Sequence, residues 1–449
     1  MKTTKLLLSS LMLASSLFAM GGCSSNDDPE IPVNPENPAV GESAGTMVIY
    51  EANPRFFATN NCINAINDRL DEIKALGTTV LWIMPVCEPG ELKSVGSPYC
   101  IKNYKAMNPR YGTVADLKSL VDNAHSMGMD VIIDWVANHT SWDNEWITEH
   151  PDWYTQDGAG NIISPEGQNW TDVADLNYDN AAMRAAMIDA MAYWITETGI
   201  DGFRCDYTDG VPHDFWAEAI TQLRAIDSEL FMLSESEGSD YLNDGFDMYY
   251  DWSYASLVKD LFNGGKADTF FDKADALLDA IDDASQVMRY VYNHDVAMSN
   301  TLASLYGGAD ALPAAYALTT LLNGTPLVYS SMETELPSNG TLSFFDYNPL
   351  TWNSGKAEVY ATINQIYAAT ADVRGGKLST YSTGDVATFT RVNGSHAMLV
   401  MVNPTNTTVS VKVPITYSGT TMRNMLTSTD EELPVAIELD GYGYAIYYK

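Results

Sequence analysis

The 449-residue sequence has little positive charge. Lys and Arg together number 24 against 59 Asp and Glu, so the formal net charge is −35 at pH 7. A surface this acidic repels phosphate backbones and anionic lipid headgroups. The composition therefore argues against nucleic acid as a partner and is compatible with a neutral substrate.

Cysteine and histidine are also scarce, at 5 and 6 residues. No CxxC pair or His/Cys cluster has zinc spacing, and neither GxGxxG nor GxxxxGK[ST] follows an expected strand. The sequence thus lacks the usual marks of zinc, dinucleotide and P-loop sites. Cys87 and Cys100 could close one loop by a disulfide, whereas Cys205 lies within an apolar stretch and is expected to be a buried thiol.

Apolar residues make up 46% of the chain and charged residues 18%, which is typical of a folded globular protein. The chain also carries 10 Trp and 26 Tyr. Such rings can stack on the apolar faces of sugars while offering a polar edge. Core packing accounts for most of them, so composition alone names no function.

The N-terminus has the features of an export signal. Lys2 and Lys5 precede the apolar run Leu6–Met20, which is too short to be read as a membrane span. The following Gly-Gly-Cys resembles a bacterial lipoprotein signal, with cleavage after residue 22 and a lipid on the sulfur of Cys23. The alternative is an ordinary secretory peptide with a chance cysteine.

Residues 23–45 are rich in Pro, Asn, Ser and acids and have no apolar period, so they are expected to form a flexible tether. Their start, Ser24–Asp28, resembles the surface-export signals of Bacteroidetes lipoproteins. We therefore expect an exported monomer, anchored to the outer membrane on its cell-surface side. Its only membrane contact would be the lipid on Cys23.

From Met47 onward, short apolar strands alternate with amphipathic helices. Several expected helices end at glycines suited to a left-handed cap, namely Gly77, Gly128, Gly199 and Gly324. Eight strands of this kind predict an α/β fold, a closed parallel (β/α)8 TIM barrel; a doubly wound open sheet is the alternative. The expected strands are Met47–Tyr50, Val80–Met84, Val131–Val136, Gly202–Asp206, Phe231–Ser234, Phe246–Tyr249, Met288–Tyr292 and Leu327–Tyr329. The expected helices include Ile63–Leu76, Val114–Met127, Ala182–Thr198, His213–Leu223 and Ala311–Leu322.

Two regions interrupt this alternation. Residues 139–180 are rich in Trp, Asp, Asn and Gly, without helical periodicity, and are expected to form a lid or small subdomain after the third strand. After about Gly376 only β segments remain, which predicts a terminal antiparallel sandwich over residues 376–449. Residues 46–138 and 181–375 would then form the barrel.

Polar residues gather where the expected strands end, and barrel enzymes place their chemistry at those ends. The third strand runs into Asp134, Asn138 and His139, and the fourth ends in Gly-Phe-Arg-Cys-Asp with Arg204 and Asp206. A carboxylate at one strand end is often only a helix cap. The whole set predicts a catalytic rim, which Glu235 on the fifth strand and His294 and Asp295 after the seventh would complete.

These segments resemble, in order, the signature regions of the α-amylase family of glycoside hydrolases (family 13). D-x-x-x-N-H is matched at residues 134–139, G-F-R-x-D at 202–206 and N-H-D at 293–295, with the family's glutamate at Glu235. A further segment is matched by Val173–Asn177, and Ser97-Pro98-Tyr99 resembles the second βα connection. The resemblance implies a barrel, a domain B after the third strand and a C-terminal β domain.

The resemblance also implies roles in retaining glycoside hydrolysis. Asp206 would be the nucleophile, Glu235 the acid/base and Asp295 the third catalytic carboxylate, binding sugar hydroxyls. His139 and His294 would donate hydrogen bonds to the same sugar, and Tyr99 would stack beneath it. Arg204 lies two residues before Asp206, so strand alternation places both on one face, where the cation is expected to lower the pKa of Asp206. Glu235 should stay protonated through burial and nearby negative charge.

The sequence departs from the family at Asp209 and Gly210, where many α-amylases have Lys-His. We expect this change to make the leaving-group side of the cleft wider and more acidic. Family calcium sites use an asparagine, an acidic residue and the carbonyl of that histidine. Asn138 and Asp175 could still supply oxygen ligands for Ca2+, and a glycine still supplies a carbonyl; no organic cofactor is expected.

Three functions remain open at this point. The first is an α-amylase that cuts α-1,4 bonds in starch, glycogen or maltooligosaccharides. The second is an α-glucosidase or transglycosylase of the same family. The third is a catalytically silent surface glycan-binding protein, which the complete set of three carboxylates disfavours.

Overall fold

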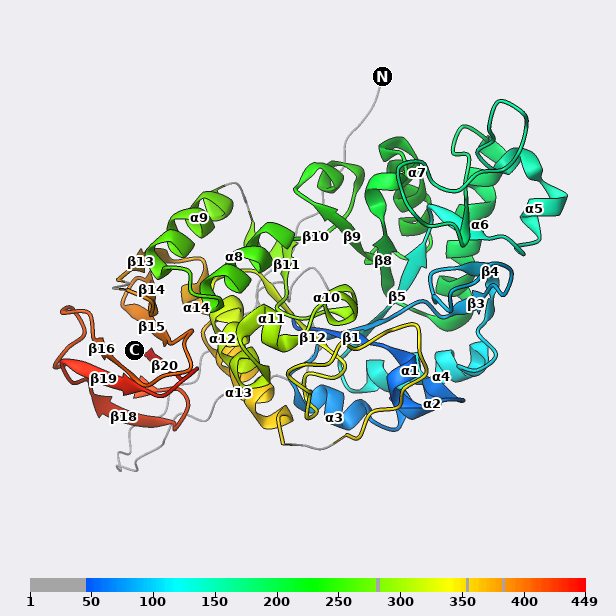
Figure 1. The fold of residues 1–449 in the computed structure, drawn as a ribbon. Coiled ribbons are helices and arrows are strands. Elements are labelled where there is room, and N and C mark those ends of the chain that lie inside the picture. The colour runs from blue at the N-terminus through cyan, green and yellow to red at the C-terminus, as the bar shows by residue number, and fades with distance from the viewer. Residues whose placement is uncertain (1–45, 280–282, 353–354, 382–383) are drawn as a thin grey trace, which may run out of the picture. The chain divides into compact units, whose positions relative to one another are not determined.

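Eight parallel strands close into a barrel in the order β1-β12-β11-β10-β9-β8-β5-β2, as the computed structural model shows (Figure 1). The model describes residues 46–449 except 280–282, 353–354 and 382–383. Closure confirms the predicted barrel and excludes an open sheet. The strands are β1 (Ile49–Ala52), β2 (Val80–Ile83), β5 (Asp130–Val136), β8 (Gly202–Asp206), β9 (Phe231–Glu237), β10 (Met248–Tyr250), β11 (Val287–Arg289) and β12 (Thr325–Tyr329).

The strands form where the sequence places short apolar runs, because both of their faces are buried. Side chains such as Trp82, Ile132 and Leu327 pack together in one buried cluster. The largest deviation is at the seventh strand, where Met288–Tyr292 was predicted and β11 ends at Arg289. Its last residue pairs with Pro326 of β12. Because proline has no N–H to donate, the ladder stops there and the following residues run on unpaired to the site.

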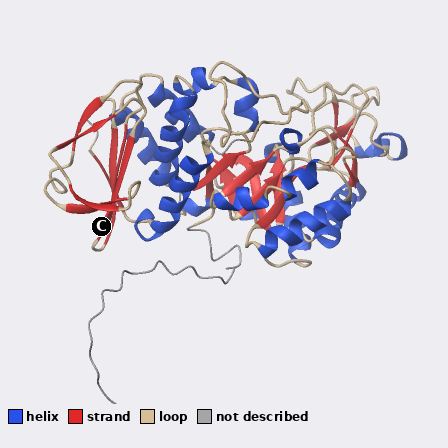
Figure 2. Cartoon of the chain, turned by 90° about the horizontal axis from the view of Figure 1, so that it is seen from below, coloured by secondary structure: helices blue, strands red, loops and turns tan. Residues whose placement is uncertain are grey.

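Helices cover the barrel, as the blue helices around the red strands in Figure 2 show. The four glycines predicted to end helices all have positive φ, from 69° at Gly128 to 99° at Gly324. The main helices are α4 (Val114–Ser126), α6 (Ala181–Thr198), α7 (His213–Arg224), α8 (Trp252–Phe262), α9 (Ala267–Asp279), α12 (Leu312–Leu322) and α13 (Ala357–Ala369). Shorter ones are α1 (Pro54–Phe57), α10 (His294–Ser299), α11 (Leu302–Tyr306) and α14 (Ala371–Arg374).

The single helix predicted over Ile63–Leu76 is wrong. The chain forms α2 (Cys62–Asn67) and α3 (Leu70–Ala75) with a break at Arg69. The Arg69 N–H bonds to the carbonyl of Ile66, three residues back, which tightens the turn. Its guanidinium lies over the ring of Trp352, 4.6 Å from the centroid. A contact made in the tertiary structure therefore accompanies the break, and the local pattern did not show it.

The segment after β5 forms a small irregular region over residues 139–180. It contains the antiparallel pair β6 (His139–Ser141) and β7 (Val173–Asp175), which joins its two ends, and the short helix α5 (Trp146–Glu149). A hairpin of β3 (Cys87–Pro89) and β4 (Ile101–Met107) follows β2. We call residues 139–180 domain B below.

The disulfide suggested between Cys87 and Cys100 does not form, because both thiols are free. The Cys87 thiol lies 3.5 Å from the carbonyl of Tyr104, and the Cys100 thiol lies 3.3 Å from that of Asp172. The hairpin places Gly90, not Cys87, opposite Cys100. Cys205 is a fully buried thiol within β8, as predicted.

The C-terminal residues form antiparallel sheets, as predicted. A six-stranded sheet has the order β13-β14-β15-β20-β17-β18, and β16 and β19 form a second, two-stranded sheet. Their shared core includes Leu399, Val411 and Leu439. Arg391 ties this region to the barrel, since its side chain donates to the carbonyl of Leu322 at the end of α12. The strands are β13 (Lys377–Thr380), β14 (Ala387–Asn393), β15 (His396–Val402), β16 (Val409–Lys412), β17 (Thr421–Asn424), β18 (Thr429–Glu432), β19 (Ala436–Leu439) and β20 (Tyr444–Tyr448).

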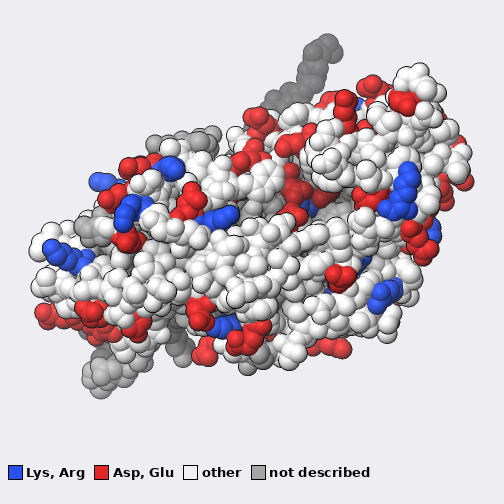
Figure 3. Space-filling model, in the orientation of Figure 1, with Lys and Arg blue, Asp and Glu red and all other residues white. Residues whose placement is uncertain are grey.

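The predicted signal, the lipid attachment at Cys23 and the tether of residues 23–45 lie outside the described residues. Among the residues that are described, no helix combines the length and apolarity needed to cross a bilayer. Acidic side chains are more abundant than basic ones on the face drawn in Figure 3, in line with the acidic composition of the chain.

Candidate active site

A cleft of about 640 Å³ opens at the carboxyl ends of the barrel strands. The segments after β5, β8, β9 and β11 contribute to its lining, together with domain B and the loop near residue 344. The structure thus brings together the three predicted catalytic carboxylates and the three predicted sugar contacts other than Arg204. The lining residues used below are Tyr99, His139, Trp170, Asp206, Tyr207, Asp209, Glu235, His294, Asp295 and Phe344.

Arg204 lies below the cleft and is completely buried. Its Nη1 is 2.8 Å from Asp134 Oδ1 and 3.1 Å from Asp206 Oδ1, and its Nη2 is 2.5 Å from Glu235 Oε1. The alternation of β8 points Arg204 and Asp206 to the same side, as predicted. One guanidinium therefore holds the carboxyl groups of Asp206 and Glu235 side by side.

The pKa of Asp206 differs from the sequence-based expectation. Burial raises it to about 6, with Asp134 and Asp295 adding to the rise, and Arg204 only partly opposes this. Arg204 does lower the pKa, as expected, but the desolvation of a buried carboxylate outweighs this one shared cation, so the net shift is upward.

The pKa of Glu235 moves in the expected direction. Burial raises it to about 7, the charges of Asp206 and Asp295 add to the rise, and Arg204 opposes it. Each carboxylate raises the pKa of the other, so the pair favours a state in which one carboxyl is ionised and the other keeps a proton. Acetal cleavage with retention needs such a pair, one group as nucleophile and one as acid.

The sequence profile of the alpha-amylase catalytic domain matches residues 55–413 of this chain. The chain belongs to the alpha-amylase family. Alpha-amylase MalA of Haloarcula japonica is 31% identical over 314 residues, which cover 65% of this chain and 44% of that protein. Trehalose synthase/amylase TreS of Mycolicibacterium smegmatis is 32% identical over 207 residues, 38% of this chain and 34% of that protein.

The crystal structure of an alpha-amylase from Lactobacillus plantarum is similar over nearly its whole length. It is 28% identical, with a TM-score of 0.79, and the match covers 91% of this chain and 99% of that one. The match with each of the two curated relatives, in contrast, spans less than half of the relative's length.

His294 of this family member sits in a network that sequence reasoning found only in part. Its Nδ1 is 2.5 Å from Glu51 Oε1, and its Nε2 is 3.0 Å from the hydroxyl of Tyr99 and 3.4 Å from Asp295 Oδ2. Burial lowers the pKa of His294, but Asp295 and Glu51 outweigh burial and raise it to about 9. The imidazole is therefore cationic at neutral pH.

Glu51 was not predicted as a site residue, although one signal was present. It is the only charged residue in the apolar run from Met47 to Ala52, and it is fully buried. A carboxylate in that position needs a charged partner. The partner is 243 positions away in sequence, so it could not be named without the fold.

Tyr99 and His139 both line the cleft. The Tyr99 ring stacks on His294 with centroids 5.5 Å apart, and its hydroxyl donates to Asp134 Oδ2 over 3.0 Å. His139 has its ring nitrogens 3.2 Å from the Tyr99 carbonyl oxygen and 3.2 Å from the amide nitrogen of Asn138. Burial lowers the pKa of His139 to about 4, so this imidazole is neutral, in contrast to His294.

The residues expected to bind calcium make an incomplete set. Asn138 is buried, and Asp175 pairs with His139 on the β6–β7 ladder. In the described part of the chain, no three His, Cys, Asp or Glu side chains gather in a way that could hold a metal ion. Calcium takes six to eight oxygen ligands, so a glycine carbonyl and further oxygen ligands would have to complete the set that Asn138 and Asp175 begin. Calcium binding stays a prediction.

The wider cleft expected on the leaving-group side stays a prediction, but the space beside Gly210 itself is occupied. A Cβ on Gly210 would lie 2.4 Å from both Asn138 Oδ1 and Tyr207 Cε1, so that space is filled. Asp209 does line the cleft, and burial raises its pKa. The departure from the family therefore leaves an acidic group in the cleft without widening it at Gly210.

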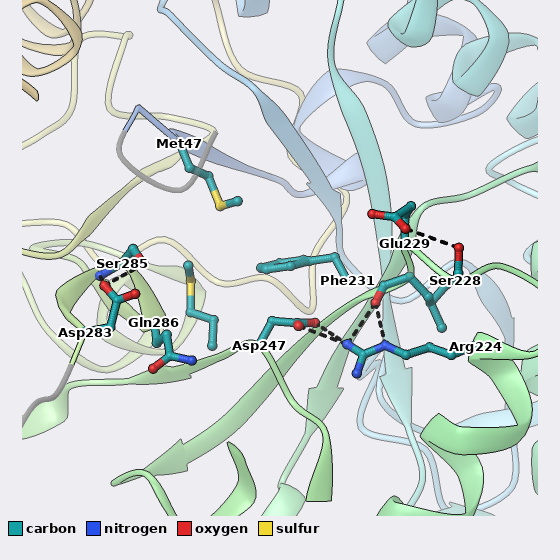
Figure 4. A pocket seen from close by; sticks show the side chains of 11 residues that line it. Met47, Arg224, Ser228, Glu229, Phe231, Asp247, Asp283, Ser285 and Gln286 are labelled. Carbon is teal, nitrogen blue, oxygen red and sulfur yellow. Dashed lines mark hydrogen bonds and ion pairs between the residues drawn. The ribbon is translucent and has the colours of Figure 1, made fainter. Parts of the chain in front are cut away.

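A second hollow, of about 360 Å³, lies near the start of β9 and β10 (Figure 4). Nη2 of its Arg224 lies 2.9 and 2.8 Å from the two carboxylate oxygens of Asp247 and also donates to the carbonyl of Leu230. Ser285 donates to Asp283. These polar groups bond to one another and leave no set of groups directed at a ligand. We therefore place the candidate active site in the larger cleft.

Proposed function

We propose that the chain hydrolyses α-1,4-glucosidic bonds in starch, glycogen or maltooligosaccharides with retention at the anomeric carbon. The observation that carries this proposal is the shared guanidinium of Arg204. It contacts both Asp206 and Glu235, whose pKa values are raised to about 6 and about 7. Membership of the alpha-amylase family supports the same reaction.

In the first step, Glu235 donates its proton to the glycosidic oxygen as the bond between that oxygen and the anomeric carbon breaks. Asp206 attacks the anomeric carbon from the opposite face and forms a glycosyl ester. In the second step, Glu235 takes a proton from water, and the water oxygen displaces Asp206 from the same carbon. Two displacements restore the starting configuration, and both carboxyl groups regain their initial protonation states.

The surrounding groups would bind and orient the sugar ring on which positive charge develops. Asp295 would accept hydrogen bonds from sugar hydroxyls, and the His294 cation would donate one from Nε2, where Tyr99 and Asp295 now lie. Tyr99 would lie beneath the sugar. The imidazole of His139 is neutral, and both of its ring nitrogens contact other protein atoms. To donate a hydrogen bond to the sugar from Nε2, His139 would have to release the Tyr99 carbonyl.

Product analysis separates this proposal from its alternatives. Chromatography of the products from starch, pullulan and maltotriose should show mixed oligosaccharides early for an endo-acting amylase. Early glucose alone would indicate an α-glucosidase, and products longer than the maltotriose supplied would indicate transfer. Binding of starch without any turnover would leave a silent glycan-binding protein.

We also propose that the chain is an exported monomer held at the outer membrane by a lipid on Cys23. The support is the Gly-Gly-Cys sequence after an apolar run, with an acidic stretch behind it. Cys23→Ser should release the protein from the membrane fraction into the soluble one, with protease accessibility of whole cells testing the surface orientation. Retention of the variant in the membrane would contradict lipid anchoring.

A further inference from the structure

Tyr207, the residue after Asp206, has an unusual backbone. Its φ is 42° and its ψ is 53°, a left-handed conformation that bulky residues rarely adopt. Such a conformation costs free energy and is typical of functional sites. In this conformation the Tyr207 N–H donates to Glu235 Oε2 over 2.7 Å. With Arg204 on Oε1, both oxygens of Glu235 are held.

The same turn directs the Tyr207 ring to domain B. Its centroid is 5.0 Å from that of Trp170, at an interplanar angle of 82°. Its hydroxyl accepts a hydrogen bond of 2.8 Å from the side-chain amide of Gln168. Tyr207 and Trp170 both line the cleft, and we call these two rings the aromatic wall.

The ring of Tyr207 in the aromatic wall leaves no room for the histidine side chain that many family members have at the position of Gly210. The ring of Tyr207 fills the space in which a Cβ of residue 210 would stand, at 2.4 Å from Cε1 and 2.5 Å from Cδ1. The neighbouring position is Asp209, and no Lys or Arg is among the described residues lining the cleft. Charged donors to a sugar are therefore missing on this side, while apolar ring surface is present.

We propose that the aromatic wall of Tyr207 and Trp170 binds the sugar on the leaving-group side of the scissile bond. The proposal rests on the proposed function. The acid must lie beside the leaving oxygen, so a residue whose N–H touches the carboxyl of Glu235 borders the departing sugar. Sugar C–H faces pack on aromatic rings, and this contact needs no charged donor.

Tyr207 thus links two tasks in one residue. Its backbone orients the acid, and its side chain binds the glucosyl unit that the acid releases. In the second step, a new sugar on the aromatic wall can replace water: its hydroxyl oxygen attacks the anomeric carbon, its proton passes to Glu235, and Asp206 leaves. The wall therefore favours substrates that extend past the cleavage point and raises the share of transfer to sugar over hydrolysis.

The test compares a substrate that needs this wall with one that does not. Maltopentaose occupies the leaving-group side, whereas α-maltosyl fluoride has only fluoride there, which departs without a proton from the acid. Tyr207→Ala and Trp170→Ala should each lower kcat/KM for maltopentaose about tenfold through a higher KM. On α-maltosyl fluoride each should lie within about twofold of the unchanged enzyme, because the missing contact is not used.

Further measurements exclude a merely structural effect. Tyr207→Phe keeps the ring and should retain most of the activity on maltopentaose. The alkaline limb of the pH profile should stay in place in Tyr207→Ala, since the N–H to Glu235 remains. Trp146→Ala changes a domain B residue outside the cleft lining and controls for a general destabilisation of domain B. It should leave the ratio of kcat/KM for maltopentaose to kcat/KM for α-maltosyl fluoride unchanged.

The outcomes are distinct. Equal losses on both substrates, or no loss on maltopentaose, would overturn the aromatic wall as a leaving-group site. An unchanged share of transfer products in Tyr207→Ala at high maltopentaose would overturn its role in the second step. If the unchanged enzyme turns over neither substrate, the proposed function itself fails, and the variants are not needed to show it.

Discussion

Glu51 Oε1 lies 2.5 Å from His294 Nδ1, and both side chains are buried. The pair joins the end of β1 to the start of α10. Because the pKa of His294 is raised to about 9, the imidazole carries a positive charge at neutral pH. That charge stands in a site with Asp295 and Asp206 and offsets part of their mutual repulsion.

Glu51→Gln should destabilise the protein by about 3 kcal/mol at pH 7, because it leaves a buried cation without its partner. The folded-state pKa of His294 lies above its unfolded value, so its contribution is fully present below pH ~6.5 and is lost as pH rises through about 9. Denaturant unfolding of both proteins at pH 7 and pH 9.5 measures this difference. A stability difference that grows at pH 9.5 would contradict the ion pair.

The pH profile of kcat/KM should be bell-shaped. Asp206 must lose its proton to attack, so activity rises with pH through its pKa of about 6. Glu235 must keep its proton to act as the acid, so activity falls as pH rises through its pKa of about 7. On α-maltosyl fluoride, which needs no acid in the first step, the alkaline limb of kcat/KM should be absent in the unchanged enzyme. Persistence of that limb would assign it to another group.

Asp206→Asn should abolish turnover and preserve binding of maltooligosaccharides. The amide keeps the shape of the side chain but cannot form the glycosyl ester. Residual kcat above about a tenth of the original, a barrier change below ~1.4 kcal/mol, would exclude a nucleophilic role. Asp214→Asn, at an exposed position on α7, is the matched control and should retain full activity.

Gly210→Ala should cost about 1–3 kcal/mol of stability, because its Cβ would overlap Tyr207 and Asn138. Combining it with Tyr207→Ala removes one of the two overlaps. The double variant should therefore lose less stability than the sum of the single losses, which thermal unfolding of the four proteins measures. Strict additivity would mean that the two residues do not compete for space.

The barrel could be predicted because its strands are buried on both faces, so each appears as a short apolar run before a helix. The carboxylates of the site could be predicted because they stand at strand ends, as in the family. Contacts between residues far apart in the sequence could not be predicted. Cys87 and Cys100 looked suitable for a bond, but the hairpin register separates their thiols. Glu51 and its partner His294 lie far apart in the sequence, so only the fold shows that they pair.

The pKa of Asp206 shows a second limit of the sequence. Arg204 was correctly placed beside it, yet one guanidinium is divided among three carboxylates, and burial decides the net direction. The backbone of Tyr207 is a third case. Only the folded turn shows that a tyrosine takes a left-handed conformation and fills the space beside Gly210. Neither the division of Arg204 among three carboxylates nor the left-handed turn at Tyr207 has a local pattern in the sequence.

Retention is the property on which the proposed chemistry of Asp206 and Glu235 depends, and the carboxyl groups of a retaining pair stand about 5–5.5 Å apart. Proton NMR of the first products from maltopentaose, recorded before mutarotation, reports the configuration at the new reducing end. The α-anomer should appear first and convert slowly to the equilibrium mixture. First appearance of the β-anomer would show a single displacement and would contradict a glycosyl ester on Asp206.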